Sequence, residues 1–156
     1  MTSTIFLKRA QNELLLSQII FTISSTTKIK EELFSLPLCT TFYSAVITHS
    51  YYAIFYSAKA YLSSKNITTK HPLEHKKTFE ELSILAEKGI IDFELFKAYK
   101  KVLIKANKLL DLFSLEKQKR GTFTYKTLPQ ANKDPANESI KNAHIFFKHI
   151  NMLLLK

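Results

Sequence analysis

The stretch that decides the fold runs from Thr40 to Ser64 and reads TTFYSAVITHSYYAIFYSAKAYLSS. It contains neither glycine nor proline, and its apolar residues leave almost no continuous polar face. A helix buried on nearly every side has this composition. A pair of β-strands is the alternative, because Tyr, Phe, Val and Ile favour strands, but so long a run without a turn signal argues against it. We therefore expect a central, buried helix.

Segments on both sides of this stretch predict further helices, because their apolar residues recur every three or four positions. A Ser/Thr cluster at 24–27 ends the first of them, and Gly89 occupies a C-cap position. Asp134 caps the last one, with Pro135 at its first position. The predicted helices cover residues 4–22, 40–64, 75–89, 92 to about 113, and 134 onward, with a short turn of helix at 29–34.

Length and composition favour a single all-α domain over residues 1–156, an up-down bundle of four to five helices. Two glycines and four prolines are too few for a β protein with many turns or for a disordered chain. No apolar run is long enough to span a bilayer, and no secretory signal precedes the first helix. A lone Cys39 suits a reducing compartment, so we expect a cytoplasmic protein.

Charge and motifs narrow the possible functions. The formal net charge of +10 favours polyanionic partners such as RNA, although a solvated, lysine-rich surface has the same composition. The two glycines form no phosphate-binding loop, which excludes P-loop and dinucleotide chemistry. The five histidines and the single cysteine lack the spacing of a zinc site. We expect neither a metal nor a cofactor.

A basic segment from Leu115 to Asn132 breaks the helical periodicity and is predicted to be an exposed loop. It contains Arg120, one of only two arginines in the chain, whose planar guanidinium suits phosphate recognition. Its aromatic rings could stack on bases. The other residues predicted to contact RNA in this segment are Lys117, Lys119, Phe123, Tyr125 and Lys126.

A stripe of polar side chains runs along the otherwise apolar central helix. His49, Tyr52, Tyr56 and Lys59 follow one another at steps of three and four residues, so they lie on one face. Polar groups on a buried helix need partners or solvent. The stripe therefore predicts a cleft or a subunit interface.

Four segments together resemble the HEPN superfamily, most closely its small prokaryotic stand-alone members. The likeness covers about residues 5–155 and implies a bundle of four or five helices that forms a homodimer. In many members the cleft between the protomers cleaves RNA without a metal. The segments that carry the resemblance are SYYAIFYSAKAYLSSKNI (50–67), HKKTFEEL (75–82), KGIIDFELF (88–96) and SIKNAHIFFKHI (139–150).

The family's catalytic signature is an Arg followed, after four to six residues, by a His. Arg120 fits the phosphate-binding position, but Tyr125 stands where active members carry His, and no His lies between Arg120 and His144. Tyrosine, with an ordinary pKa of about 10, is a poorer base than His at neutral pH. Three hypotheses follow: an RNA-cleaving toxin or defence module, a non-catalytic module that binds RNA or a nucleotide, and a partner of a minimal nucleotidyltransferase acting as antitoxin.

Overall fold

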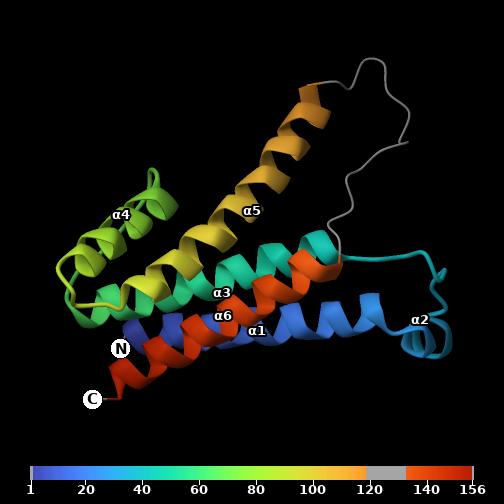
Figure 1. Cartoon of the computed structure of the whole chain (residues 1–156), viewed down its shortest axis with the longest axis horizontal. Helices are drawn as coiled ribbons and strands as arrows, with labels where there is room; N and C mark the ends of the chain where they lie inside the picture. Colours follow the sequence, from blue (N-terminus) through green and yellow to red (C-terminus); the bar gives the residue numbers. More distant parts are fainter. Residues whose placement is uncertain (1, 119–132, 156) are drawn as a thin grey trace.

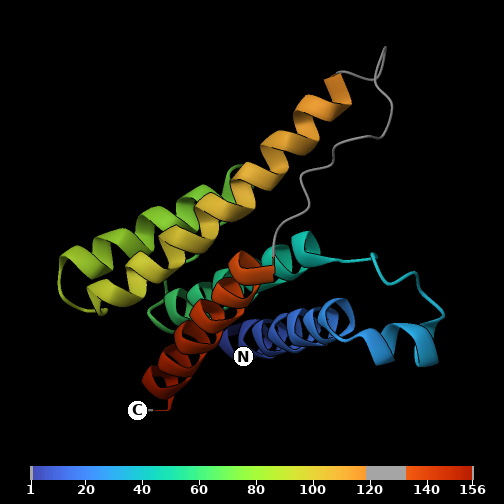
Figure 2. The ribbon, with the colours of Figure 1, turned by 45° about the vertical axis from the view of Figure 1, so that its right-hand side comes forward.

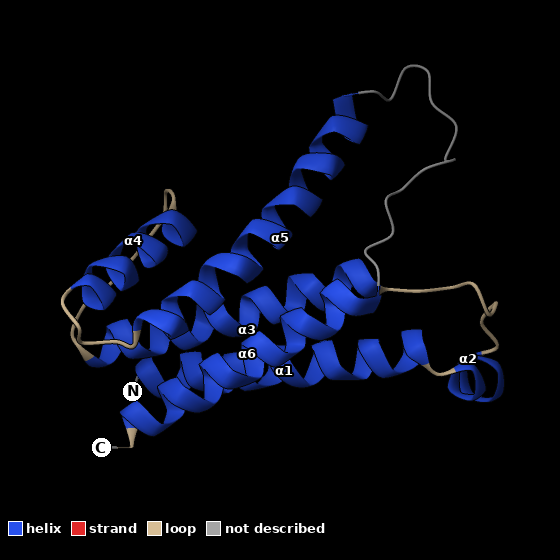
Figure 3. Cartoon of the chain, viewed as in Figure 1, coloured by secondary structure: helices blue, strands red, loops and turns tan. Residues whose placement is uncertain are grey.

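The computed structural model describes residues 2–118 and 133–155, and every element within them is a helix (Figures 1 and 3). The prediction of an all-α bundle is confirmed. The six helices of the described residues are α1 (Thr2–Ser25), α2 (Thr27–Phe34), α3 (Tyr43–Ser64), α4 (Glu74–Glu87), α5 (Phe93–Gln118) and α6 (Lys133–Leu154).

Helix α3 is the centre of the bundle and packs against α1, α4, α5 and α6. Figure 1 shows it between α1 and α6 on one side and the α4–α5 pair on the other. From Ser50 to Leu62, only Tyr52 and Tyr56 are not buried. Small residues let the neighbouring helices approach closely, since Ala53, Ala58 and Ala60 are all fully buried. The expected central helix is thus confirmed.

The connection from α2 to α3, residues 35–42, is held in place by polar contacts. The Nζ atom of buried Lys30 donates hydrogen bonds to the carbonyl oxygens of Leu38 and Thr40, at 2.7 and 3.2 Å. The backbone N–H of Phe42 donates to Ser24 Oγ at 2.9 Å. The exposed Cys39 belongs to this connection. These contacts fix the start of α3 relative to the end of α1.

Two short connections bring α4 and α5 back along α3 (Figure 2). Gly89 follows α4 with φ of 67°, the left-handed conformation that glycine adopts most readily, as its predicted C-cap role requires. Before α5, Asp92 Oδ1 accepts a hydrogen bond from the backbone N–H of Glu94 at 2.8 Å and so caps the helix. The main core then joins α3, α4, α5 and α6, with Tyr99 and Phe146 among its fully buried side chains.

The structure corrects three details of the sequence-based prediction. α5 ends at Gln118 rather than near Phe113, so the first residues of the predicted loop, Leu115 to Gln118, are helical. Their loss of apolar periodicity does not end a helix, because Leu, Glu, Lys and Gln are good helix formers. Phe93, whose spacing of three residues from Phe96 fits the apolar face of the helix predicted from residue 92, is 51% exposed. α6 begins at Lys133, so Asp134 and Pro135 lie in its first turn.

None of the helices in the described part of the chain combines the length and the apolar character needed to cross a membrane.

Candidate functional site

The residues predicted from the basic segment fall almost entirely outside the part of the chain that the structure describes. Lys117 lies in the last turn of α5. Five predicted site residues are outside the described ranges: Lys119, Arg120, Phe123, Tyr125 and Lys126. Their predicted roles therefore stay predictions.

The polar stripe of α3 lies between α1 and α4. On the α1 side, His49 Nδ1 is 2.7 Å from Glu13 Oε2. Tyr56 stacks with Phe6, and the Arg9 guanidinium lies 4.3 Å from the centre of the Tyr56 ring. An Arg over an aromatic face is attracted by the negative potential of the ring. His49 and Tyr56 therefore both have partners on α1. That the stripe lines a cleft or a subunit interface stays a prediction.

Lys59 is the buried cation of the stripe, with only 9% of its surface exposed. Its Nζ forms an ion pair with Glu74 of α4 and lies 3.4 Å from the Thr69 carbonyl oxygen and 4.5 Å from the centre of the Phe6 ring. Burial lowers the pKa of Lys59, and the neighbouring Arg9 lowers it further. The ion pair and the carbonyl oxygen replace the favourable interactions with water that the ammonium loses on burial.

His75, in the first turn of α4, meets the middle of α3. Its Nδ1 is hydrogen-bonded to Tyr51 Oη at 2.7 Å, and its ring stacks on Phe55 with 4.0 Å between ring centres. Burial lowers the pKa of His75, with smaller effects from Lys59 and His71, while burial raises the pKa of Tyr51 to about 12. The imidazole is therefore neutral at pH 7. The sequence did not predict the His75–Tyr51 pair, because the contact depends on the turn that folds α4 back onto α3.

The lowered pKa of His75 predicts a loss of stability in mild acid. The unfolded chain binds a proton near pH 6.5 whereas the folded chain binds it only at lower pH, so the contribution of His75 is complete above pH 6.5. It decreases as the pH falls from 6.5 through the folded pKa. We expect His75→Gln to flatten this part of the curve of unfolding free energy against pH, measured by urea denaturation. The matched change His144→Gln, on the exposed face of α6, should leave the curve unchanged; equal curves for wild type and His75→Gln would contradict the assignment.

The His75–Tyr51 pair is remote from the end of α5. Tyr99 packs against Tyr51, with 6.3 Å between ring centres. Gln118 lies nineteen residues further along α5, which at 1.5 Å per residue is about 28 Å. The described structure therefore separates His75 from the part of α5 that leads into the Arg120 segment.

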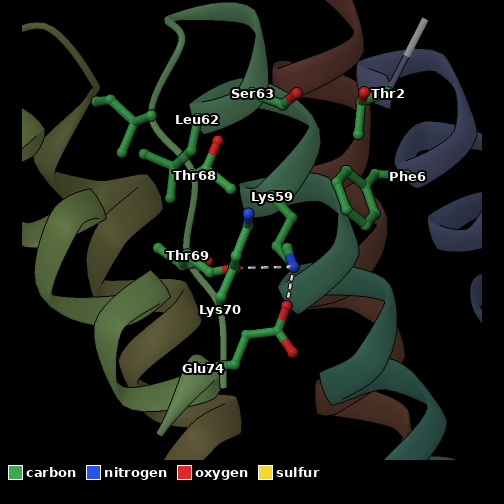
Figure 4. Close-up of a pocket in the computed structure, with 10 residues that line it drawn as sticks. Thr2, Phe6, Lys59, Leu62, Ser63, Thr68, Thr69, Lys70 and Glu74 are labelled. Atoms are coloured by element: carbon green, nitrogen blue, oxygen red, sulfur yellow. Dashed lines mark hydrogen bonds and ion pairs between the residues drawn. The ribbon is translucent and has the colours of Figure 1, made fainter. Parts of the chain in front are cut away.

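A pocket of about 380 Å³ opens where the start of α1, the end of α3 and the start of α4 meet (Figure 4). Lys59 and Glu74 form one wall, and the Phe6 ring another. Lys70 comes from the connection between α3 and α4. The other residues that line the pocket are Thr2, Leu62, Ser63, Ile67, Thr68 and Thr69. Two ammonium groups, one carboxylate and several hydroxyl groups thus surround one cavity of ligand size.

Metal ligands do not gather in this structure. Among the side chains that the structure describes, those of residues 2–104, 106–107 and 133–155, no three His, Cys, Asp or Glu are placed to hold one ion. The functional groups at the described sites are ammonium, carboxylate, imidazole, phenol and hydroxyl groups.

The described residues form a small all-α bundle around one buried helix, α3, in a chain with a net charge of +10. The family model described as HEPN domain matches residues 35–153, about three quarters of the chain. The chain therefore belongs to the HEPN family. No curated protein and no solved structure matches it significantly. The match begins after α1 and α2, so Phe6, Arg9 and Glu13, which contact the α3 stripe, precede it.

Proposed function

We propose that this HEPN protein acts on RNA, as a metal-independent endoribonuclease of a toxin–antitoxin or defence module. The observation that carries the proposal is the family match over residues 35–153, which includes both Arg120 and Tyr125. The net charge of +10 supports a polyanionic substrate. Active family members place an Arg and a His at this spacing, and Arg120 keeps the first of the two.

The reaction that this proposal implies uses RNA's own 2′-hydroxyl as the nucleophile. Its oxygen bonds to the adjacent phosphorus, the bond from phosphorus to the 5′-oxygen breaks, and a 2′,3′-cyclic phosphate and a 5′-hydroxyl remain. The 2′-hydroxyl proton passes to a base and the leaving oxygen takes one from solvent. Arg120 holds the charged phosphate. Tyr125 is the candidate base, and its phenolate form increases as the pH approaches about 10.

The first test incubates total RNA with purified protein in the presence of EDTA, followed by gel analysis and end-group mapping. We expect cyclic-phosphate ends with wild type, a rate that rises from pH 7 to pH 9 above protein-free controls, and no cleavage by Arg120→Ala. Lys148→Ala removes the same charge from the exposed face of α6 and should cleave like wild type. A rate independent of pH in this range would exclude Tyr125 as the base, and intact RNA in every wild-type sample would refute cleavage.

Non-catalytic binding is the second candidate, and the observation that favours it is Tyr125 in place of His. In that case wild type binds RNA without cutting it, and the affinity falls steeply as salt rises, because bound counterions are released from RNA. Gel-shift titrations at several salt concentrations measure this. If the protein binds no RNA at low salt, the non-catalytic binding hypothesis is refuted and the partner hypothesis remains. Co-purification with a minimal nucleotidyltransferase tests the partner hypothesis. Size-exclusion chromatography tests the proposed homodimer.

A further inference from the structure

The pocket between α1, α3 and α4 has more positive than negative charge. Lys59 and Lys70 each supply an ammonium group, and Glu74 supplies the one carboxylate in its lining. Figure 4 shows both lysine side chains turned into the pocket, with the hydroxyls of Thr2 and Ser63 at its rim. Formal charge in the lining is therefore +1, and Arg9 lies close enough to Lys59 to depress its pKa.

The two lysines differ in how they are held. Lys59 is nine-tenths buried and fixed by Glu74 and the Thr69 carbonyl oxygen. Lys70 is exposed, and its ammonium makes no hydrogen bond or ion pair with the residues whose side chains are described, 2–104, 106–107 and 133–155. The Lys59 ammonium is thus held in a fixed position, and the Lys70 ammonium can move to contact an anion.

We infer that this pocket binds a phosphomonoester group, presented by a free mononucleotide or by the 5′ end of an RNA. A phosphomonoester carries close to two negative charges and accepts several hydrogen bonds, which two ammonium groups and surrounding hydroxyls donate. The volume of about 380 Å³ lies within the range of small-molecule sites. Glu74 stays paired with Lys59, so Lys70 supplies the second, adjustable contact.

This site goes beyond the proposed cleavage, because cleavage rests on Arg120 whereas the phosphate site rests on Lys59 and Lys70. The residues that line the pocket come from α1, α3, α4 and the connection between α3 and α4. The phosphate site can therefore be tested in the Arg120→Ala protein, where RNA stays intact. Failure of one proposal is then distinguishable from failure of the other.

The test measures binding of AMP, with adenosine as the uncharged probe, to the full chain by isothermal titration calorimetry at low salt. We expect AMP to bind and adenosine not to bind. Lys70→Gln should weaken AMP about tenfold, the loss typical of one charge-assisted contact, and because Lys70 is exposed this variant should fold normally. Lys77→Gln removes the same charge from exposed α4 surface outside the pocket and should change affinity by less than about twofold.

A second comparison distinguishes an anion site from a site for an amine. Glu74→Gln keeps an acceptor oxygen for Lys59 but removes the negative charge that opposes phosphate, so AMP should bind more tightly. Short 2′-O-methyl oligonucleotides with and without a 5′-phosphate identify the source, since Lys70-dependent binding of the phosphorylated oligonucleotide above AMP indicates an RNA end. No AMP binding, equal binding of adenosine, an unchanged affinity in Lys70→Gln, or weaker binding in Glu74→Gln would each overturn the inference.

Discussion

Phe146→Ala should lower the free energy of unfolding by about 4 kcal/mol, within the range found when a buried phenylalanine is truncated. Phe146 is fully buried on α6, and its ring meets the ring of Tyr99 on α5 edge-on, with 5.7 Å between their centres. The truncation removes apolar contact and leaves a cavity in a core that joins α3, α5 and α6.

The measurement is urea denaturation followed by far-UV circular dichroism. Ile145→Ala is the matched control, because Ile145 is the neighbouring residue on the same helix and is 59% exposed. It should change stability by no more than about 0.5 kcal/mol. A loss of less than about 2 kcal/mol for Phe146→Ala would contradict the close packing of α6 described above.

Glu74→Ala should cost about 3 kcal/mol, because it leaves the ammonium of Lys59 buried without its carboxylate. We place the value at the lower end for broken buried pairs, since the Glu74 side chain is 25% exposed and water can enter beside it. The Thr69 carbonyl, at 3.4 Å, is a weak substitute.

Removing Lys59 should lower the free energy of unfolding by less than removing Glu74 does. Lys59→Met keeps most of the apolar stem and leaves a carboxylate that water can reach, so we expect a loss smaller than that of Glu74→Ala. The double variant Lys59→Met, Glu74→Gln contains no unpaired charge and should be more stable than Glu74→Ala alone. Three denaturation curves against wild type test this order, and additive losses in the double variant would show that the pair is not coupled.

The helices could be predicted from the sequence where local signals were strong. Gly89 ends α4 through its own backbone freedom, and the Ser/Thr cluster at 24–27 coincides with the break between α1 and α2 at Thr26. The end of α5 was wrong by five residues, because the apolar pattern stops before the helix does. Apolar periodicity predicts which face of a helix is buried, and it does not by itself mark the residue at which the helix ends.

The candidate site could be predicted only in part. The spacing of His49, Tyr52, Tyr56 and Lys59 correctly places them along α3, but their partners come from elsewhere in the chain. Glu13 and Arg9 lie more than thirty residues before their contacts, and Glu74 follows an irregular connection. No local sequence pattern predicts contacts between residues so far apart in the chain. The same reason applies to His75, whose contact with Tyr51 depends on the path of residues 65–73.

Cys39 gives the chain a single point for chemical labelling. It is the only cysteine in the sequence, it is exposed, and it lies just before the start of α3, whereas the pocket includes Leu62 and Ser63 near the other end of that helix. Nineteen residues of α3 between Tyr43 and Leu62 span about 28 Å. A spin label at this thiol thus leaves the pocket untouched, and in an assembly of two chains the distance between the two labels reports directly how the chains are arranged.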